Sequence, residues 1–200
     1  IQDDVTGRPD ELQNDAFSSV YESYTRHIYS DDKGDERKRV NFVRMLYDSK
    51  ILSTDLQLSR LFKVLRDPNI SRKTIVILLS DHGEEFMEHG SFSHSRHLYN
   101  ELLHTPLFVK MPGLSPKKIS EVTQNIDVYP TILDAIGVSN TFPIQGNSLM
   151  PLIPGGKKSG YGYAISSKDY FQKFSIQNND WKLIADFSAG PKAIPSLRLG

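Results

Sequence analysis

The stretch Thr74-Ile-Val-Ile-Leu-Leu-Ser80, followed at once by Asp81-His82-Gly83, decides how this chain folds. Its aliphatic and β-branched residues show no polar alternation, which is typical of a strand buried on both faces, as in a parallel sheet under helices. The run stops at a carboxylate and an imidazole, and open α/β sheets bind ligands at the carboxyl ends of their strands. Aspartate oxygens and neutral histidine nitrogens both bind divalent cations. We therefore expect Asp81 and His82 to converge on one point in a metal site.

The histidines of the chain are clustered just after this strand. On their own, Asp81 and His82 are equally compatible with a turn acid and a surface imidazole. Five of the six histidines, however, lie between positions 82 and 104: His82, His89, His94, His97 and His104. Such clustering beyond a buried strand favours a metal or anion site over scattered surface imidazoles. We expect His89 and His104 to be structural or exposed.

Length and composition limit the possible functions. Two hundred residues suffice for one domain with a sizeable core. The formal net charge is zero, so electrostatics gives no reason to expect binding to nucleic acid or to an anionic membrane. The absence of cysteine excludes disulfides, thiolate metal sites and a cysteine nucleophile within these residues. No apolar run approaches the ~20 residues of a membrane span.

The remaining pattern predicts helices followed by short strands. Apolar spacing predicts a long helix over 36–66, with Val43, Ile51 and Leu61 on its buried side, and Asp127 is expected to cap a helix that ends at Gly137. Further helices are expected over 15–29 and 98–103, strands over 74–80 and 107–111, and an antiparallel meander over 161–167, 171–177 and 181–187. We expect residues 1–154 to form the C-terminal part of an α/β domain, with 1–35 a variable helical lead-in, and 155–200 to form a small, truncated antiparallel β subdomain.

Several short motifs, taken together and in order, resemble the sulfatase family of the alkaline-phosphatase superfamily. The resemblance covers roughly residues 40–187 and is carried by Ser80-Asp81-His82-Gly83-Glu84, Glu88-His89-Gly90, Leu98-Tyr99-Asn100-Glu101, Thr105-Pro106-Leu107, Ile126-Asp127-Val128-Tyr129-Pro130-Thr131, Gly146-Asn147-Ser148-Leu149 and Trp181-Lys182-Leu183-Ile184. It implies an α/β fold: part of an alkaline-phosphatase-like parallel or mixed sheet flanked by helices, with a small C-terminal antiparallel sheet.

The resemblance also implies a mechanism and a set of site residues. In the family one divalent ion, usually calcium, holds a sulfate or phosphate ester against a nucleophile, which is a formylglycine or, in relatives, a serine or threonine. By resemblance, Asp81 and His82 are two of the metal ligands. His94 lies at or beside the place where many relatives carry a lysine that contacts the ester, which implies a substrate hydrogen bond or proton donation to the leaving group. His97 is the second choice for this role, and Arg96 is a third cation of the same loop.

The departures from the family pattern concern the other half of the site. The family places two further metal-binding acids near its N-terminus and its nucleophile in a Cys/Ser-x-Pro-x-Arg stretch, and neither is present here. We therefore expect the C-terminal portion of a longer hydrolase of sulfate esters, inactive by itself. A phosphodiesterase, phosphonate hydrolase or phosphoryl transferase of the same superfamily, or a non-catalytic scaffold, are the alternatives. The expected partner is a small-molecule sulfate or phosphate ester, and family habit favours an exported location.

Overall fold

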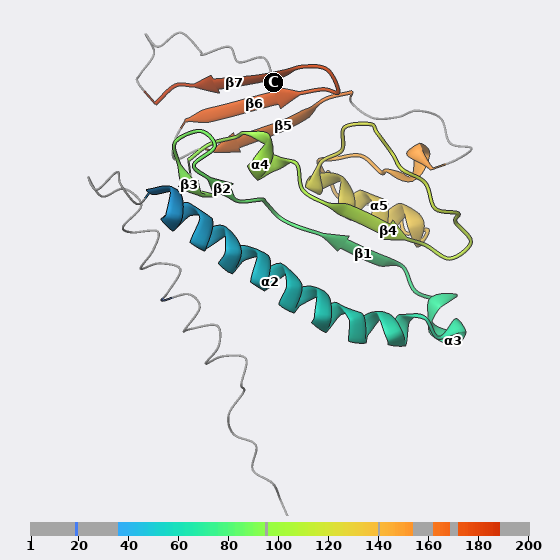
Figure 1. Ribbon diagram of the computed structural model, residues 1–200. Coiled ribbons are helices and arrows are strands. Elements are labelled where there is room, and N and C mark those ends of the chain that lie inside the picture. The colour runs from blue at the N-terminus through green and yellow to red at the C-terminus, as the bar shows by residue number, and fades with distance from the viewer. Residues whose placement is uncertain are drawn as a thin grey trace, which may run out of the picture. The chain divides into compact units, whose positions relative to one another are not determined.

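The computed structural model describes residue 19 and residues 36–94, 96–139, 141–153, 162–168 and 172–188. The chain divides into two units: a first unit of Ile1–Ile75 with Glu85–Ser93, and a second unit of Val76–Glu84 with His94–Gly200. Figure 1 shows the helices and strands of both. Apart from residue 19, the helix predicted over 15–29 lies outside the described residues.

The described residues of the first unit form one long helix, a helical turn and a small hairpin. Its elements are α2 (Glu36–Leu65), α3 (Pro68–Ser71), β2 (Glu85–Phe86) and β3 (Phe92–Ser93), and the two strands pair antiparallel. The predicted long helix is confirmed, and the chain turns out of it where Asp67 caps α3 by accepting from the Asn69 N–H at 2.8 Å. Val43 and Phe92 form the buried centre of this unit, with Phe86 packed against them.

The apolar face predicted for α2 is buried in part only. Val43 is fully buried, but Ile51 and Leu61 are 54% and 50% exposed, so the expectation that they lie on a buried side is wrong for the described structure. The reason is that the hairpin packs against the early turns of the helix, and helical spacing identifies an apolar face without specifying what covers it. Among the described helices, α2 included, none combines the length and apolar character needed to cross a membrane.

The second unit begins with the strand that the sequence singled out. Strand β1 (Val76–Leu79) pairs antiparallel with β4 (Leu107–Lys110), with Ile77 opposite Val109. The parallel pairing expected for residues 74–80 is therefore wrong: the described strands all pair antiparallel, and Leu79 is 40% exposed. After β1 the chain turns back through the short helix α4 (Asn100–Leu103) and enters β4 in the opposite direction, which produces antiparallel neighbours.

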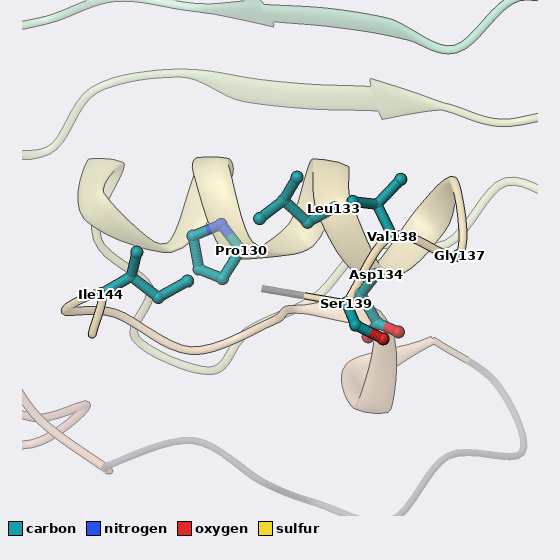
Figure 2. Close-up of a pocket in the computed structure, with 7 residues that line it drawn as sticks. All are labelled: Pro130, Leu133, Asp134, Gly137, Val138, Ser139 and Ile144. Atoms are coloured by element: carbon teal, nitrogen blue, oxygen red, sulfur yellow. The ribbon is translucent and has the colours of Figure 1, made fainter. Parts of the chain in front are cut away.

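A buried carboxylate organises the next helical segment. The 3₁₀ turn η2 (Asn125–Asp127) leads into α5 (Val128–Ala135), which runs alongside β4 (Figures 1 and 2). The sequence predicted that Asp127 caps this helix, but its side chain makes no capping bond to α5. Its two oxygens instead accept from the backbone N–H groups of Gln124 and Asn147, both at 2.9 Å. The turn at Asn147 is held further by a bond from the Leu149 N–H to Thr131 Oγ1 at 2.8 Å.

The C-terminal segments form the predicted antiparallel sheet. After the 3₁₀ turn η3 (Met150–Leu152) come β5 (Ala164–Lys168), β6 (Lys173–Gln177) and β7 (Lys182–Asp186), which pair in the order β5-β6-β7 (Figure 1). Ser166, Ser175 and Ile184 stand opposite one another across the three strands. The α/β class and the small C-terminal antiparallel sheet are thus confirmed.

We expect Asp127→Ala to lower the free energy of unfolding by about 2–3 kcal/mol, because two backbone N–H groups lose their acceptor in a buried setting. Urea unfolding followed by the fluorescence of Trp181, the one tryptophan of the chain, measures the change. Asp48→Ala is the matched control, since Asp48 is exposed on α2, and should stay within about 0.5 kcal/mol of wild type. Equal losses in both variants would contradict the role given to Asp127.

Candidate functional site

Asp81 and His82 lie where β1 ends, and the structure brings their side chains together. Asp81 Oδ2 lies 3.8 Å from His82 Nε2, while Asp81 Oδ1 accepts from the His82 backbone N–H at 3.0 Å. His82 Nδ1 lies 2.8 Å from the Gly83 carbonyl oxygen. A carbonyl oxygen only accepts, so Nδ1 carries the proton and Nε2 presents a lone pair on the side of Asp81.

The backbone at the end of β1 is fixed by side chains around it. The Asn125 amide, at the start of η2, donates to the carbonyl oxygens of Ser80 at 3.0 Å and Asp81 at 3.3 Å. The Ser80 hydroxyl donates to the His82 carbonyl oxygen at 2.6 Å. These bonds hold the backbone of the two candidate ligands, although the side chain of Asp81 is 88% exposed.

Gly83 is the point at which this turn meets α4. Its N–H donates to the Leu102 carbonyl oxygen at 2.8 Å. A Cβ at this position would lie 2.0 Å from the carbonyl oxygen of Glu101, far inside any permitted contact. The turn can therefore approach α4 only because residue 83 has no side chain.

His94 joins the same group of side chains. Its Nδ1 lies 3.0 Å from Glu84 Oε2, and its ring stacks on that of His82 with centroids 4.0 Å apart and planes 25° apart. The carboxylate accepts from Nδ1, which leaves Nε2 of His94 as the nitrogen able to meet a ligand. His97, the second choice from the sequence, packs its ring edge-on against Tyr99 at 5.2 Å.

Glu84 belongs to this group and was not selected from the sequence. Ligand atoms of His82, Glu84 and His94 lie within 4.8 Å of one another. The side chain of Glu84 is only 11% exposed, which is unusual for an acid in a loop. The available signal was its position two residues after His82, but an isolated glutamate in a loop usually indicates a solvated surface.

The donor set fits part of a divalent-cation site. A cation about 2.1 Å from an imidazole nitrogen and about 2.4 Å from a carboxylate oxygen would hold ligands 3.8 Å apart at an angle of about 115°. Asp81 and His82 thus satisfy the spacing of two neighbouring ligands. Calcium takes about six to eight oxygen ligands, so these two residues do not form a complete calcium cage.

A separate hollow of about 390 Å³ lies along one side of α5 and beside the segment that follows it (Figure 2). It is lined by Pro130, Leu133, Asp134, Gly137, Val138, Ser139 and Ile144. Its one charged lining residue, Asp134, accepts from the Ser148 hydroxyl at 2.5 Å and so holds the turn around residue 148. Because none of the predicted site residues lines this hollow, the end of β1 is the better candidate for chemistry.

Solved structures place the chain in a known fold. A phosphonate monoester hydrolase from Silicibacter pomeroyi superposes with a TM-score of 0.67 at 22% identity, covering 91% of this chain and 41% of that one. A protein solved in complex with its substrate D-glucosamine-2-N,6-O-disulfate gives a TM-score of 0.66 at 24% identity, covering 98% of this chain and 43% of that one. The chain therefore shares the fold of these two proteins.

Family comparison makes the assignment narrower. The family model described as Sulfatase matches residues 12–138, well over half of the 200 residues, so this chain belongs to the sulfatase family. A model described as N-sulphoglucosamine sulphohydrolase, C-terminal, matches residues 87–192. The resemblance seen in the sequence motifs is thereby confirmed.

Among the curated relatives are arylsulfatase K from Bos taurus, 31% identical, and from Homo sapiens, 30% identical. Each alignment covers 88% of this chain and 34% of the relative. The chain thus spans about a third of the length of these relatives.

We expect Gly83→Ala to disturb the site, because the added methyl group forces the turn away from the Glu101 carbonyl. The amide resonances of residues 81–84 should shift, and the free energy of unfolding should fall by about 1–3 kcal/mol. Gly113→Ala is the control. Residue 113 has φ at 80°, which an alanine adopts only with strain, but the added Cβ would meet open space and no neighbouring atom. Unchanged site resonances in Gly83→Ala would contradict the steric argument.

Proposed function

We propose that this chain supplies part of the active site of a metal-dependent hydrolase of sulfate esters. The supporting observation is the convergence of Asp81 Oδ2 and His82 Nε2, 3.8 Å apart, at the end of a strand in a sulfatase-family chain. The proposed reaction is that of the whole protein, since the chain spans about a third of its relatives. The neighbour solved with a disulfated glucosamine supports a sugar sulfate as the class of substrate.

Asp81 and His82 are proposed as two ligands of one divalent ion, with calcium as the family precedent. When bound, the ion would neutralise charge on the transferring sulfuryl group. His82 is prepared for this role because Gly83 holds the proton on Nδ1 and leaves Nε2 free for coordination. Glu84 and His94 form an alternative ligand set with His82, within 4.8 Å of one another.

His94 is proposed as the residue that contacts the ester. Its Nδ1 donates to Glu84 at 3.0 Å, so in the imidazolium form the Nε2–H can hydrogen-bond the ester oxygen and give its proton to the leaving group, which leaves the neutral imidazole. Lys168 donates to the His94 carbonyl oxygen at 2.7 Å and so fixes the backbone on which this imidazole sits. His97 remains the second candidate for the contact.

The nucleophile is proposed to lie outside residues 1–200, as a formylglycine or as a serine or threonine. The chain has no cysteine and no serine in the family's Cys/Ser-x-Pro-x-Arg pattern. A phosphonate or phosphate ester is the second candidate substrate, because one structural neighbour is a phosphonate monoester hydrolase. A non-catalytic scaffold stays a predicted alternative function, and an exported location stays the predicted location of the protein.

The metal proposal predicts weak but localised binding. Because two ligands leave most of the coordination shell to water, we expect calcium affinity weaker than about 1 mM by calorimetry. Paramagnetic Mn²⁺, added as a probe, should broaden the amide resonances of residues 81 and 82 first. Asp81→Ala should abolish this selectivity, whereas Asp48→Ala, an exposed acid on α2, should leave it unchanged.

Glu84→Gln distinguishes the two ligand sets. It should leave the Mn²⁺ effect intact if Asp81 and His82 bind the ion, and should abolish it if the ion sits between His82, Glu84 and His94. Broadening that is spread over all exposed acids, with no preference for the end of β1, would refute both arrangements.

The catalytic proposal concerns the whole protein. There His94→Ala should lower kcat for an aryl sulfate by about 10²–10⁴-fold while changing metal affinity little, because it removes a proton donor and not a ligand. His97→Ala is the matched control and should cost far less. The 200-residue chain by itself should not hydrolyse aryl sulfates, and turnover by it that is lost on Asp81→Ala would show that the nucleophile lies within residues 1–200.

A further inference from the structure

Lys182 is a lysine that the fold buries at the start of β7. It is 8% exposed, and its Nζ donates to Asn100 Oδ1, on the first residue of α4, at 2.9 Å. The neighbouring Glu101 supplies the opposite charge. The first residue of β7 is thus bonded to α4, the helix that follows His94 and His97, although β7 and α4 are far apart in sequence.

This arrangement carries an energetic cost. Burial lowers the pKa of Lys182 to about 8, and the attraction of Glu101 acts in the opposite direction. A methionine would fill the same space without desolvating an ammonium group, so overall stability alone does not account for a lysine here. A directed bond to Asn100 fixes geometry in a way that an apolar side chain does not.

A continuous set of contacts leads from this bond to His82. Asn100 begins the single turn of α4, and Leu102, in the same turn, accepts from the Gly83 N–H at 2.8 Å. The Glu101 carbonyl lies so close to Gly83 that no side chain fits between them. The Gly83 carbonyl in turn accepts from His82 Nδ1 at 2.8 Å. A shift of α4 must therefore move the acceptor that selects the tautomer of His82.

We propose that Lys182 is a positioning residue: by anchoring α4 through Asn100, it holds Gly83 where its carbonyl keeps the His82 proton on Nδ1 and leaves Nε2 free for a ligand. The consequence for metal binding rests on the proposed function of His82. The tautomer itself does not, because it is a property of the metal-free chain.

The test compares Lys182→Met with Lys173→Met in the full chain. Lys173 begins the neighbouring strand β6 and pairs with Asp186 at 3.2 Å, so its loss removes an ion pair from the same sheet and leaves the Lys182–Asn100 bond in place. Two-bond ¹H–¹⁵N correlation of the imidazoles, near pH 7.5 where histidine is largely neutral, reports which nitrogen carries the proton. The His82 signals are identified by their loss in His82→Gln.

Wild type and Lys173→Met should show a protonated Nδ1 and an unprotonated Nε2 at His82. In Lys182→Met this difference should collapse, with the two nitrogen shifts moving toward each other. Asn100→Ala, which removes the acceptor at an exposed position, should give the same result and serves if Lys182→Met does not fold. A wild-type tautomer in both variants would overturn the proposal.

The tautomer of His82 is measured without metal, so the test distinguishes a failure of the positioning role of Lys182 from a failure of the proposed metal binding. If Mn²⁺ shows no preference for residues 81 and 82 but the tautomer still depends on Lys182, only the proposed function fails. If the ion binds as expected and the tautomer ignores Lys182, only the positioning role fails.

Discussion

The contact between Gly83 and α4 is the constraint on which the candidate site depends. A strand that ends in Asp-His can present its side chains in many directions, and the direction here is set by the next residue. Gly83 bonds to Leu102 and leaves no room for a methyl group beneath Glu101. With the backbone fixed in this way, the Gly83 carbonyl accepts from Nδ1 of His82 and so selects its tautomer. The absence of a side chain at residue 83 thus determines which nitrogen of His82 carries the proton.

The opposite side of the turn is held by the segment around α5. Asn125 bonds to both carbonyls at the end of β1, and it lies two residues before the buried carboxylate of Asp127. Asp127 bonds backbone groups on both sides of the helix, at Gln124 and Asn147, and so keeps this segment in place. The candidate ligands are exposed, yet the backbone that carries them is bound to two separate helical segments. Such support is what a coordination geometry requires.

The sequence predicted the helices and strands better than the neighbours with which they pair, and it selected a candidate site at the end of the first strand. Asp81 and His82 were identifiable because ligand-type residues follow an aliphatic run, and the C-terminal meander because its strands are short and separated by turn residues. The antiparallel pairing of β1 with β4 was not, because an apolar run indicates burial and contains no information on strand direction. The prediction that Ile51 is buried was wrong for a related reason: helical spacing identifies an apolar face but does not show which segment packs against it. Glu84 was missed because its burial and its bond to His94 exist only in three dimensions.

For the proposed function, the balance of charge at the end of β1 bears on the choice between sulfate and phosphate esters. A sulfate monoester carries one negative charge and a phosphate monoester about two near neutral pH, so each acid that binds the ion reduces the attraction for the more highly charged substrate. In the proposed arrangement Asp81 would be one such acid, whereas Glu84 is paired with His94 and adds little net charge when that imidazole is protonated. The cations Arg96 and Lys168 lie beside the same loop. Counted over these described side chains, the end of β1 is therefore close to electrically balanced.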